Sequence, residues 1–253
     1  MIIFVRKLGH SYFQPMKQYK TIFLDWDDTI GDFRYAADKA LREMYVLHRL
    51  NRFFPDYDSY YSVYHEHNLS LWEKYEKQQI SKTLLHFDRF YYPLSVATAD
   101  MPTRVRHDIQ QMAIAMGSDF LHLTSVHFRL LDGAEDAIRY LASKYPLTIV
   151  SNGFVEVQYE KVNLSGLQSC FSHIVLSEEV GAQKPNPEIF RYALLLNKCQ
   201  PQDALMIGDS YPSDIQGAIN AGIDQLWLTD WQPSAQTPCT YQRLHLKDAV
   251  EML

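Results

Sequence analysis

The chain has 253 residues, of which 47% are hydrophobic and 21% are charged, and its formal net charge is −6. A chain of this length can bury a substantial core. Its acidic balance provides no basic face for a phosphate backbone, so we expect no nucleic acid polymer as a partner. The three cysteines form no CxxC pair, which predicts neither a disulfide framework nor a zinc site.

Residues 1–18 mix apolar, basic and aromatic side chains without a sustained period. The apolar run at 1–5 leads straight into Arg6 and is too short for a membrane span or a signal-peptide core. We therefore expect a cytoplasmic protein that does not associate with a membrane. Because Met16 stands just before the first strong strand pattern, residues 1–18 are predicted to be an N-terminal extension, or Met16 to be the start.

Short apolar runs along the chain predict a parallel sheet whose strands are buried on both faces. They lie at 21–24, 147–150, 173–176, 204–207 and 225–228. Helical patterns at 134–143 and 187–196 separate some of these runs, which is typical of βαβ units with right-handed crossovers. The expected fold class is α/β, with a Rossmann-like, doubly wound parallel sheet as its core.

The segment 33–127 shows no strong strand pattern. Ala37, Ala40, Leu41 and Met44 recur at the spacing of an amphipathic helix. Further helices are expected at 59–75, 81–92 and 104–121. These patterns predict an α-helical bundle domain at 33–127, inserted into a core made of residues 19–32 and 128–253.

Carboxylates follow two of the predicted strands. Asp25 and Asp27 stand at the C-terminal end of the first strand, and Asp209 and Asp214 follow the fourth. Open α/β sheets build their ligand sites at this edge. Carboxylates that converge in a partly dry crevice repel one another unless they are protonated or bind a cation, and oxygen-only ligands favour Mg²⁺.

Two further segments offer groups that suit a phosphoryl oxygen. The second strand ends in Ser151, Asn152 and Gly153, which supply a hydroxyl, an amide and a backbone N–H. Lys184 lies in a segment whose backbone is restricted by two prolines ahead of a helix. Taken singly, such features also occur as ordinary turns, solvated lysines and helix caps.

Taken in order, these elements resemble the four motifs of the haloacid dehalogenase superfamily. The matches are Asp25-Trp26-Asp27-Asp28-Thr29, Ser151-Asn152-Gly153, Lys184-Pro185, and Gly208-Asp209-Ser210 with Asp214. The insertion is similar to the helical C1-type cap of that superfamily, and residues 72–90 resemble the subgroup that contains pyrimidine 5'-nucleotidases. One departure is Asp28, where many members of the superfamily carry glycine.

The resemblance implies a role for each matched residue. Asp25 would be the nucleophile, and Asp27 would act as general acid and base. Mg²⁺ would be held by the Asp25 side chain, the Asp27 backbone carbonyl and Asp209, with Asp214 nearby. The residues implied to surround the phosphoryl group are Thr29, Ser151, Asn152, Gly153 and Lys184, and the cap residues that could read the substrate are Phe33, Arg34 and Arg89.

The expected function is magnesium-dependent hydrolysis of a small phosphomonoester through an aspartyl-phosphate, with a nucleoside 5'-monophosphate favoured by the subgroup resemblance. A sugar-phosphate phosphatase and a phosphomutase stay open. A catalytically silent regulatory protein that keeps the fold is the alternative of another class. Asp27 argues against a dehalogenase, which lacks the second aspartate. Both a monomer and a homodimer are compatible with the sequence.

Overall fold

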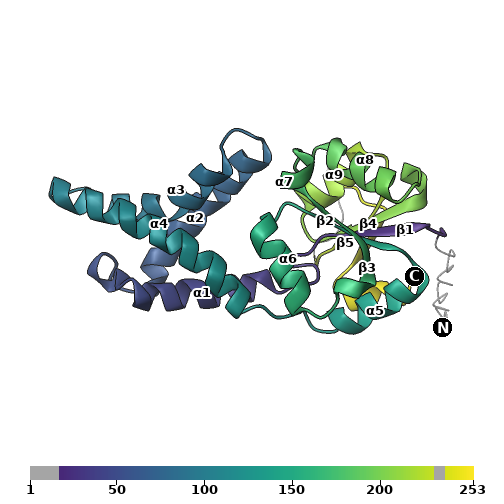
Figure 1. Ribbon diagram of the computed structural model, residues 1–253, viewed down its shortest axis with the longest axis horizontal. Coiled ribbons are helices and arrows are strands. Elements are labelled where there is room, and N and C mark those ends of the chain that lie inside the picture. The colour runs from purple at the N-terminus through teal and green to yellow at the C-terminus, as the bar shows by residue number, and fades with distance from the viewer. Residues whose placement is uncertain (1–16, 231–236) are drawn as a thin grey trace, which may run out of the picture.

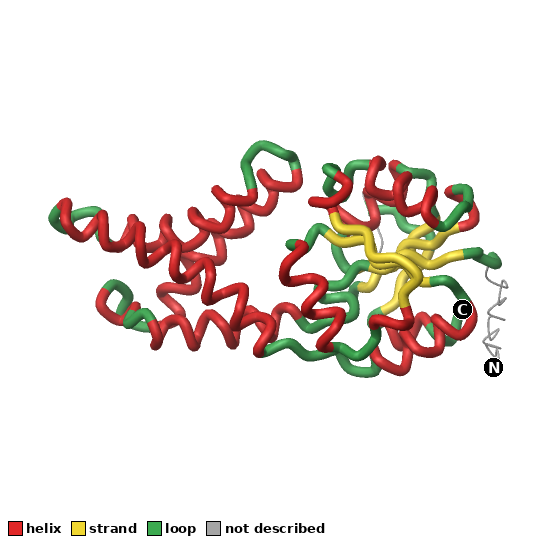
Figure 2. The backbone as a smooth tube through the Cα atoms, in the orientation of Figure 1, coloured by secondary structure: helices red, strands yellow, loops and turns green. Residues whose placement is uncertain are grey.

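The computed structural model describes residues 17–230 and 237–253. It consists of an α/β part built on a twisted sheet and an elongated bundle of helices beside it (Figures 1 and 2). The hypothesis that Met16 is the start, and most of the expected extension at 1–18, lie outside the described residues. Within the described ranges, no helix combines the length and the apolar character that crossing a membrane requires.

The sheet has six parallel strands in the order β3-β2-β1-β4-β5-β6. The strands are β1 (Thr21–Leu24), β2 (Leu147–Ser151), β3 (Phe171–Leu176), β4 (Ala204–Gly208), β5 (Asp224–Leu228) and β6 (Tyr241–Arg243). Strand order reverses at β1, whose neighbours are β2 on one side and β4 on the other. Ligands bind at such a reversal point in open α/β sheets. The predicted fold class is confirmed; β6 was not predicted, because its three half-buried residues form no apolar run.

Helices cover both faces of the sheet. One face carries α5 (Ala134–Lys144), α6 (Val155–Leu164) and α10 (Leu246–Ala249), and the other carries α7 (Ser177–Val180), α8 (Pro187–Leu196) and α9 (Gln216–Asn220). Successive side chains of β1 point to opposite faces of the sheet, so each face presents apolar side chains to its own layer of helices. Ile22 and Leu24 join the apolar cluster of the α5 face, whereas Phe23 joins the cluster that contains Phe190 of α8.

The helical bundle consists of α1 (Phe33–Leu47), α2 (Tyr57–Glu76), α3 (Lys82–Ala97) and α4 (Thr103–Val126). Side chains cap three of them: Asp32, Asp56 and Ser81 each accept a hydrogen bond from a first-turn N–H. The bundle has its own apolar cluster, which includes Met44, Tyr60, Phe90 and Met116. We therefore propose residues 33–127 as a cap domain on a core of residues 19–32 and 128–253.

Helix α3 is longer than the sequence predicted. We expected it to end at residue 92, before Pro93, but it continues through that proline to Ala97. Pro93 and Leu94 are both buried in the bundle. Tertiary packing therefore outweighs the free-energy cost of a proline inside a helix, which local propensity alone does not reveal.

The bundle meets the α/β part in two places. Where the chain enters and leaves the bundle, Gly31 pairs with Leu130, and the N–H of Asp32 donates to the carbonyl of Arg129 at 2.9 Å. At the second place the Phe154 ring stacks on Trp72, with centroids 5.6 Å apart. The α2–α3 end of the bundle thus rests against the segment that follows β2.

Candidate active site

Three carboxylates meet at the reversal point of the sheet. Asp25 follows β1, and its N–H donates to the carbonyl of Ile207 in β4 at 3.0 Å, so the pairing of these strands extends to the acid itself. Asp209 follows β4, and Asp214 lies in the helical turn Tyr211–Ile215. One ligand oxygen from each of Asp25, Asp209 and Asp214 lies within 4.8 Å of the other two.

The Lys184 ammonium lies among these acids. Its Nζ atom is 2.6 Å from a carboxylate oxygen of Asp25 and 2.6 Å from one of Asp214, and the side chain is only 2% exposed. Burial alone would lower the pKa of Lys184, but the charges of Asp214 and Asp25 outweigh it and raise that pKa. Burial raises the pKa of Asp25 well above its ordinary value; Lys184 opposes the rise, while Asp214 and Asp209 add to it.

The charge of the site fits a divalent cation. Five carboxylates gather here, from Asp25, Asp27, Asp28, Asp209 and Asp214. They are opposed by three cations, Lys184, Lys161 and Arg34, which leaves two negative charges uncompensated. Burial, followed by the charges of Asp214 and Asp28, raises the pKa of Asp209 to about 7. An all-oxygen donor set with this charge suits Mg²⁺.

Asp214 is held in place by contacts on both of its carboxylate oxygens. It is completely buried; its Oδ1 receives the Lys184 ammonium, and its Oδ2 accepts the N–H of Ser210 at 3.0 Å. The close packing also explains Gly208, because a Cβ atom there would lie only 2.2 Å from Asp214 Oδ2. A side chain at position 208 would therefore displace the carboxylate.

The segment after β2 organises Lys184. The Asn152 amide accepts the N–H of Lys184 at 2.8 Å and donates to its carbonyl at 2.9 Å, so it holds both backbone groups of that residue. Ser151 Oγ accepts the Gly153 N–H at 3.0 Å. Thr29 is fully buried, with its hydroxyl 3.5 Å from Asp209. Contact of these residues with a phosphoryl group stays a prediction.

Three polar residues at the site, Lys161, Gln158 and Glu76, were not predicted from the sequence. Lys161 Nζ lies 2.7 Å from Asp27 Oδ1, and Gln158 Nε2 lies 3.0 Å from Ser151 Oγ. Their i, i+3 spacing on the helix directly after Ser151-Asn152-Gly153 was the signal available. Glu76, at the end of α2, reaches from the cap to within 3.5 Å of the Asn152 amide nitrogen, and burial raises its pKa.

The backbone conformation of Asp28 explains why many members of the superfamily carry glycine at this position. Its φ of 61° lies in the left-handed region, which glycine adopts at less cost. The Asp28 carboxylate accepts the N–H of Arg34 at 2.9 Å and pairs with its Nε at 3.3 Å. Burial raises the pKa of Asp28 to about 6, against the opposing effect of Arg34.

The cap candidates lie in different environments. The Arg34 side chain is 80% exposed and reaches Asp209 Oδ2 at 3.4 Å, so it lies at the site. The Phe33 ring lies beneath the Lys161 ammonium, 4.6 Å from the centroid. Arg89 is 3% exposed inside the cap, where its Nη2 donates to the Tyr64 hydroxyl at 2.7 Å.

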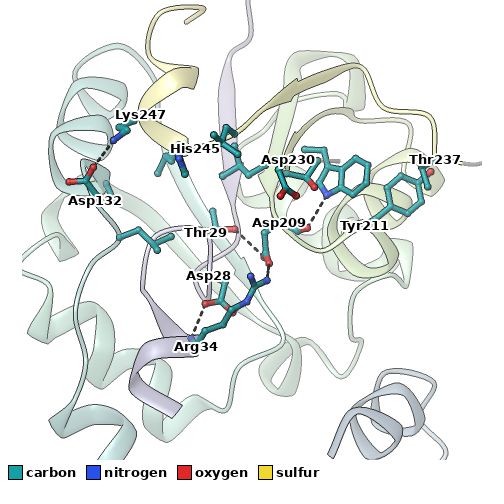
Figure 3. Close-up of a pocket in the computed structure, with 17 residues that line it drawn as sticks. Asp28, Thr29, Arg34, Asp132, Asp209, Tyr211, Asp230, Thr237, His245 and Lys247 are labelled. Atoms are coloured by element: carbon teal, nitrogen blue, oxygen red, sulfur yellow. Dashed lines mark hydrogen bonds and ion pairs between the residues drawn. The ribbon is translucent and has the colours of Figure 1, made fainter. Parts of the chain in front are cut away.

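A cleft of about 700 Å³ opens on the β4–β5 side of the carboxylates. Asp28, Thr29, Arg34 and Asp209 form one wall, as Figure 3 shows. The Trp227 indole lines the cleft and donates to the backbone carbonyl of Asp209 at 2.9 Å. The cleft therefore reaches Asp209 and the loop after β1 from the β4–β5 side of the sheet.

Comparison with known proteins identifies relatives over most of the chain. The family model described as haloacid dehalogenase-like hydrolase matches residues 19–222. The putative HAD-hydrolase YfnB of Bacillus subtilis is 29% identical, over 94% of this chain and 97% of its own length. The pyrimidine 5'-nucleotidase YjjG of Escherichia coli is 29% identical over 82% and 84%, respectively. The glyceraldehyde 3-phosphate phosphatase of Pyrococcus abyssi is 30% identical over 83% and 81%.

The solved structure of YfnB superposes with a TM-score of 0.78 and covers 94% of this chain and 99% of its own. That protein was solved bound to magnesium and is described as revealing interdomain movement. Together these matches confirm the resemblance that the four motifs predicted, including the likeness to pyrimidine 5'-nucleotidases.

Proposed function

This chain belongs to the haloacid dehalogenase-like hydrolase family, and from that premise we propose that it is a magnesium-dependent phosphomonoester hydrolase acting through an aspartyl-phosphate. The observation that carries the proposal is the position of Asp25 at the strand reversal, 2.6 Å from the Lys184 ammonium and beside Asp209. A nucleophile, a buried cation and a cation-binding carboxylate thus converge on one point.

In the first half-reaction, a carboxylate oxygen of Asp25 forms a bond to phosphorus while the bond from phosphorus to the leaving oxygen breaks. The leaving oxygen keeps the electron pair and takes a proton from the Asp27 carboxyl group. In the second half-reaction, Asp27 accepts a proton from water as the water oxygen attacks phosphorus. Phosphate then departs, and the Asp25 carboxylate is restored.

The surrounding groups stabilise charge on the transferring phosphoryl group. Lys184, held by Asn152, faces the nucleophile. Thr29, Ser151 and the Gly153 N–H are the further groups that would contact the phosphoryl oxygens. Mg²⁺, held by the Asp25 and Asp209 carboxylates and the Asp27 carbonyl, would supply positive charge against the carboxylates and the phosphate. Asp214 would orient the Lys184 ammonium, and through it the Asp25 carboxylate.

For the substrate we propose a small phosphomonoester, with a nucleoside 5'-monophosphate first. The likeness to YjjG and to the Streptococcus pneumoniae pyrimidine 5'-nucleotidase PynA supports this choice. The likeness to glyceraldehyde 3-phosphate phosphatases supports a sugar phosphate as the second candidate. A phosphomutase and a catalytically silent regulator are alternatives for the assay to exclude, and a cytoplasmic location stays a prediction.

The decisive assay measures inorganic phosphate released from purine and pyrimidine 5'-monophosphates and from sugar phosphates, with Mg²⁺ or with EDTA. We expect Mg²⁺-dependent release that Asp25→Asn abolishes. Asp136→Asn, an exposed substitution in the first turn of α5, is the matched control and should leave release unchanged. The substrate that is hydrolysed with the highest kcat/KM identifies the class of phosphomonoester on which the enzyme acts.

Three other outcomes would redirect the proposal. A rearranged sugar phosphate in place of free phosphate would identify a phosphomutase. Absence of release from every substrate by the folded protein would favour the silent regulator. Undiminished release by Asp25→Asn would place the chemistry elsewhere in the molecule.

A further inference from the structure

Helix α6 presents two polar side chains to the catalytic crevice. Gln158 and Lys161 lie one turn apart and are 0% and 4% exposed, respectively. The Lys161 ammonium lies 2.7 Å from Asp27 Oδ1 and 3.5 Å from the Gln158 amide oxygen. Its remaining surroundings include the Phe33 ring, 4.6 Å away. Both residues therefore face the group that the proposed mechanism uses for proton transfer.

The fold alone gives no reason for this lysine. Burying an ammonium costs free energy unless it is paired, and an apolar residue at the same position would pack without that cost. Its partner Asp27 is 27% exposed at the side chain and could be solvated without help. Burying Lys161 beside Asp27 therefore lowers the free energy of unfolding, and we see its benefit in the orientation of the Asp27 carboxyl group.

The contacts define that orientation. Oδ1 of Asp27 accepts the Lys161 ammonium at 2.7 Å, whereas the one donor to Oδ2 among the described residues is the Gln158 amide, at the long distance of 3.5 Å, so Oδ2 is the oxygen left to exchange a proton. Gln158 Nε2 lies 3.5 Å from Oδ2 and 3.0 Å from Ser151 Oγ, so one amide spans Asp27 and the second motif. Helix α6 thus determines which carboxyl oxygen is directed to the leaving group.

We infer that Lys161 is a positioning residue, which holds the Asp27 carboxyl group so that Oδ2 delivers the proton to the leaving oxygen. The inference rests on the proposed phosphatase function and deepens it. Lys161 itself exchanges no proton and does not touch the phosphoryl group. Because Phe33 begins the first cap helix and packs on Lys161, the same contact couples Asp27 to the base of the cap.

A comparison of leaving groups tests the inference. An alkyl phosphate such as a nucleoside 5'-monophosphate needs protonation of its leaving oxygen, whereas p-nitrophenyl phosphate releases a weakly basic phenolate that needs little. For Lys161→Met we expect kcat/KM for the alkyl phosphate to fall roughly a hundredfold. For p-nitrophenyl phosphate it should fall by less than roughly fivefold. Competitive inhibition by inorganic phosphate should be unchanged.

Two further variants separate positioning from general damage to α6. Lys161→Arg, which keeps a cation, should restore much of the alkyl phosphate activity. Val162→Ala, at the neighbouring and fully buried position, should lower stability without selecting between the two substrates. If Lys161→Met does not fold, Lys161→Gln gives the same comparison with a polar head group retained.

The outcomes distinguish this inference from the function on which it rests. Equal losses for the two substrates in Lys161→Met, or no loss, would overturn the positioning role while the wild type remains a phosphatase. The same holds if Val162→Ala reproduces the selective loss. A wild type that hydrolyses neither substrate would overturn the proposed function and, with it, the inference.

Discussion

Lys184 and Asp214 form a completely buried ion pair, with Nζ and Oδ1 2.6 Å apart and side chains that are 2% and 0% exposed. The same ammonium also contacts Asp25 at 2.6 Å. One cation therefore compensates two carboxylates, one directly after β1 and the other in the helical turn that follows β4. Removing one partner from such a cluster leaves uncompensated charge in the interior, which is costly.

We expect Lys184→Met to lower the free energy of unfolding by about 3 kcal/mol at neutral pH, measured by urea denaturation without metal. It should also abolish phosphate release. Lys74→Met, an exposed lysine on α2, is the control and should change stability by less than about 0.5 kcal/mol. Equal stability of the two variants would show that the acids tolerate the loss by other means.

Asp209→Asn should separate metal binding from folding. At a hundredfold excess over its dissociation constant, Mg²⁺ should stabilise the wild type by about 2.7 kcal/mol, and the variant should lose most of this gain. The experiment compares thermal unfolding with Mg²⁺ and with EDTA. An identical Mg²⁺ shift in both proteins would remove Asp209 from the ligand set.

In EDTA, the same variant should depend on pH in a defined direction. The folded-state pKa of Asp209, about 7, lies above its ordinary value of 3.8, so ionising this carboxyl group costs stability in the fold. The cost is full above about 7 and disappears as the pH falls toward 3.8. Asp209→Asn should therefore be more stable than the wild type at alkaline pH and indistinguishable from it near the lower value.

His86 should make the protein sensitive to acid. It lies against Phe154 with ring centroids 4.4 Å apart, and burial lowers its pKa from 6.5 to about 4. A depressed folded-state pKa gives stability that is present above 6.5 and is lost as the pH falls toward 4. The full change in pKa would correspond to about 3 kcal/mol. Because the imidazole is only partly buried and solvent screens its charge, we expect the wild type to lose about 1 to 2 kcal/mol relative to His86→Gln across this interval. Parallel stability curves would contradict this expectation.

Lys82 should hold the cap against the core. Its ammonium lies 2.8 Å from Glu156 and 2.9 Å from Glu178, both of them in the α/β part. Lys82→Met should speed hydrogen exchange around the α2–α3 connection and lower kcat/KM several-fold, with a global stability change of at most about 1 kcal/mol. Lys77→Met, which follows α2 and loses only the pair with Glu73 inside the cap, should do neither.

Asp28 offers a test of backbone strain. Asp28→Gly and Asp28→Ala both remove the contacts with Arg34, but only glycine adopts a φ of 61° without steric cost. We expect the glycine variant to be more stable than the alanine variant by about 1 kcal/mol in urea denaturation. Equal stability would mean that the first-motif loop relaxes around alanine.

Local pattern in the sequence determined the sheet and the strand ends that carry Asp25 and Asp209. Buried parallel strands read as apolar runs, and the acids at their ends are visible without knowledge of any distant contact. The same local signal failed at β6, which has no apolar run, and at α3, where burial of Pro93 and Leu94 outweighs the proline.

Only the tertiary structure decided how the polar side chains are paired. The Asn152 amide holds the backbone of Lys184, the Lys161 ammonium holds Asp27, and the Arg89 guanidinium lies inside the cap against Tyr64. Asp27 and Lys161 stand 134 positions apart in the sequence, so only the folded chain brings them together. Spacing along the chain indicates which face of a helix or strand a residue occupies. The residue that it meets across that face depends on how the helices and strands stack, and packing of the whole core sets this stacking.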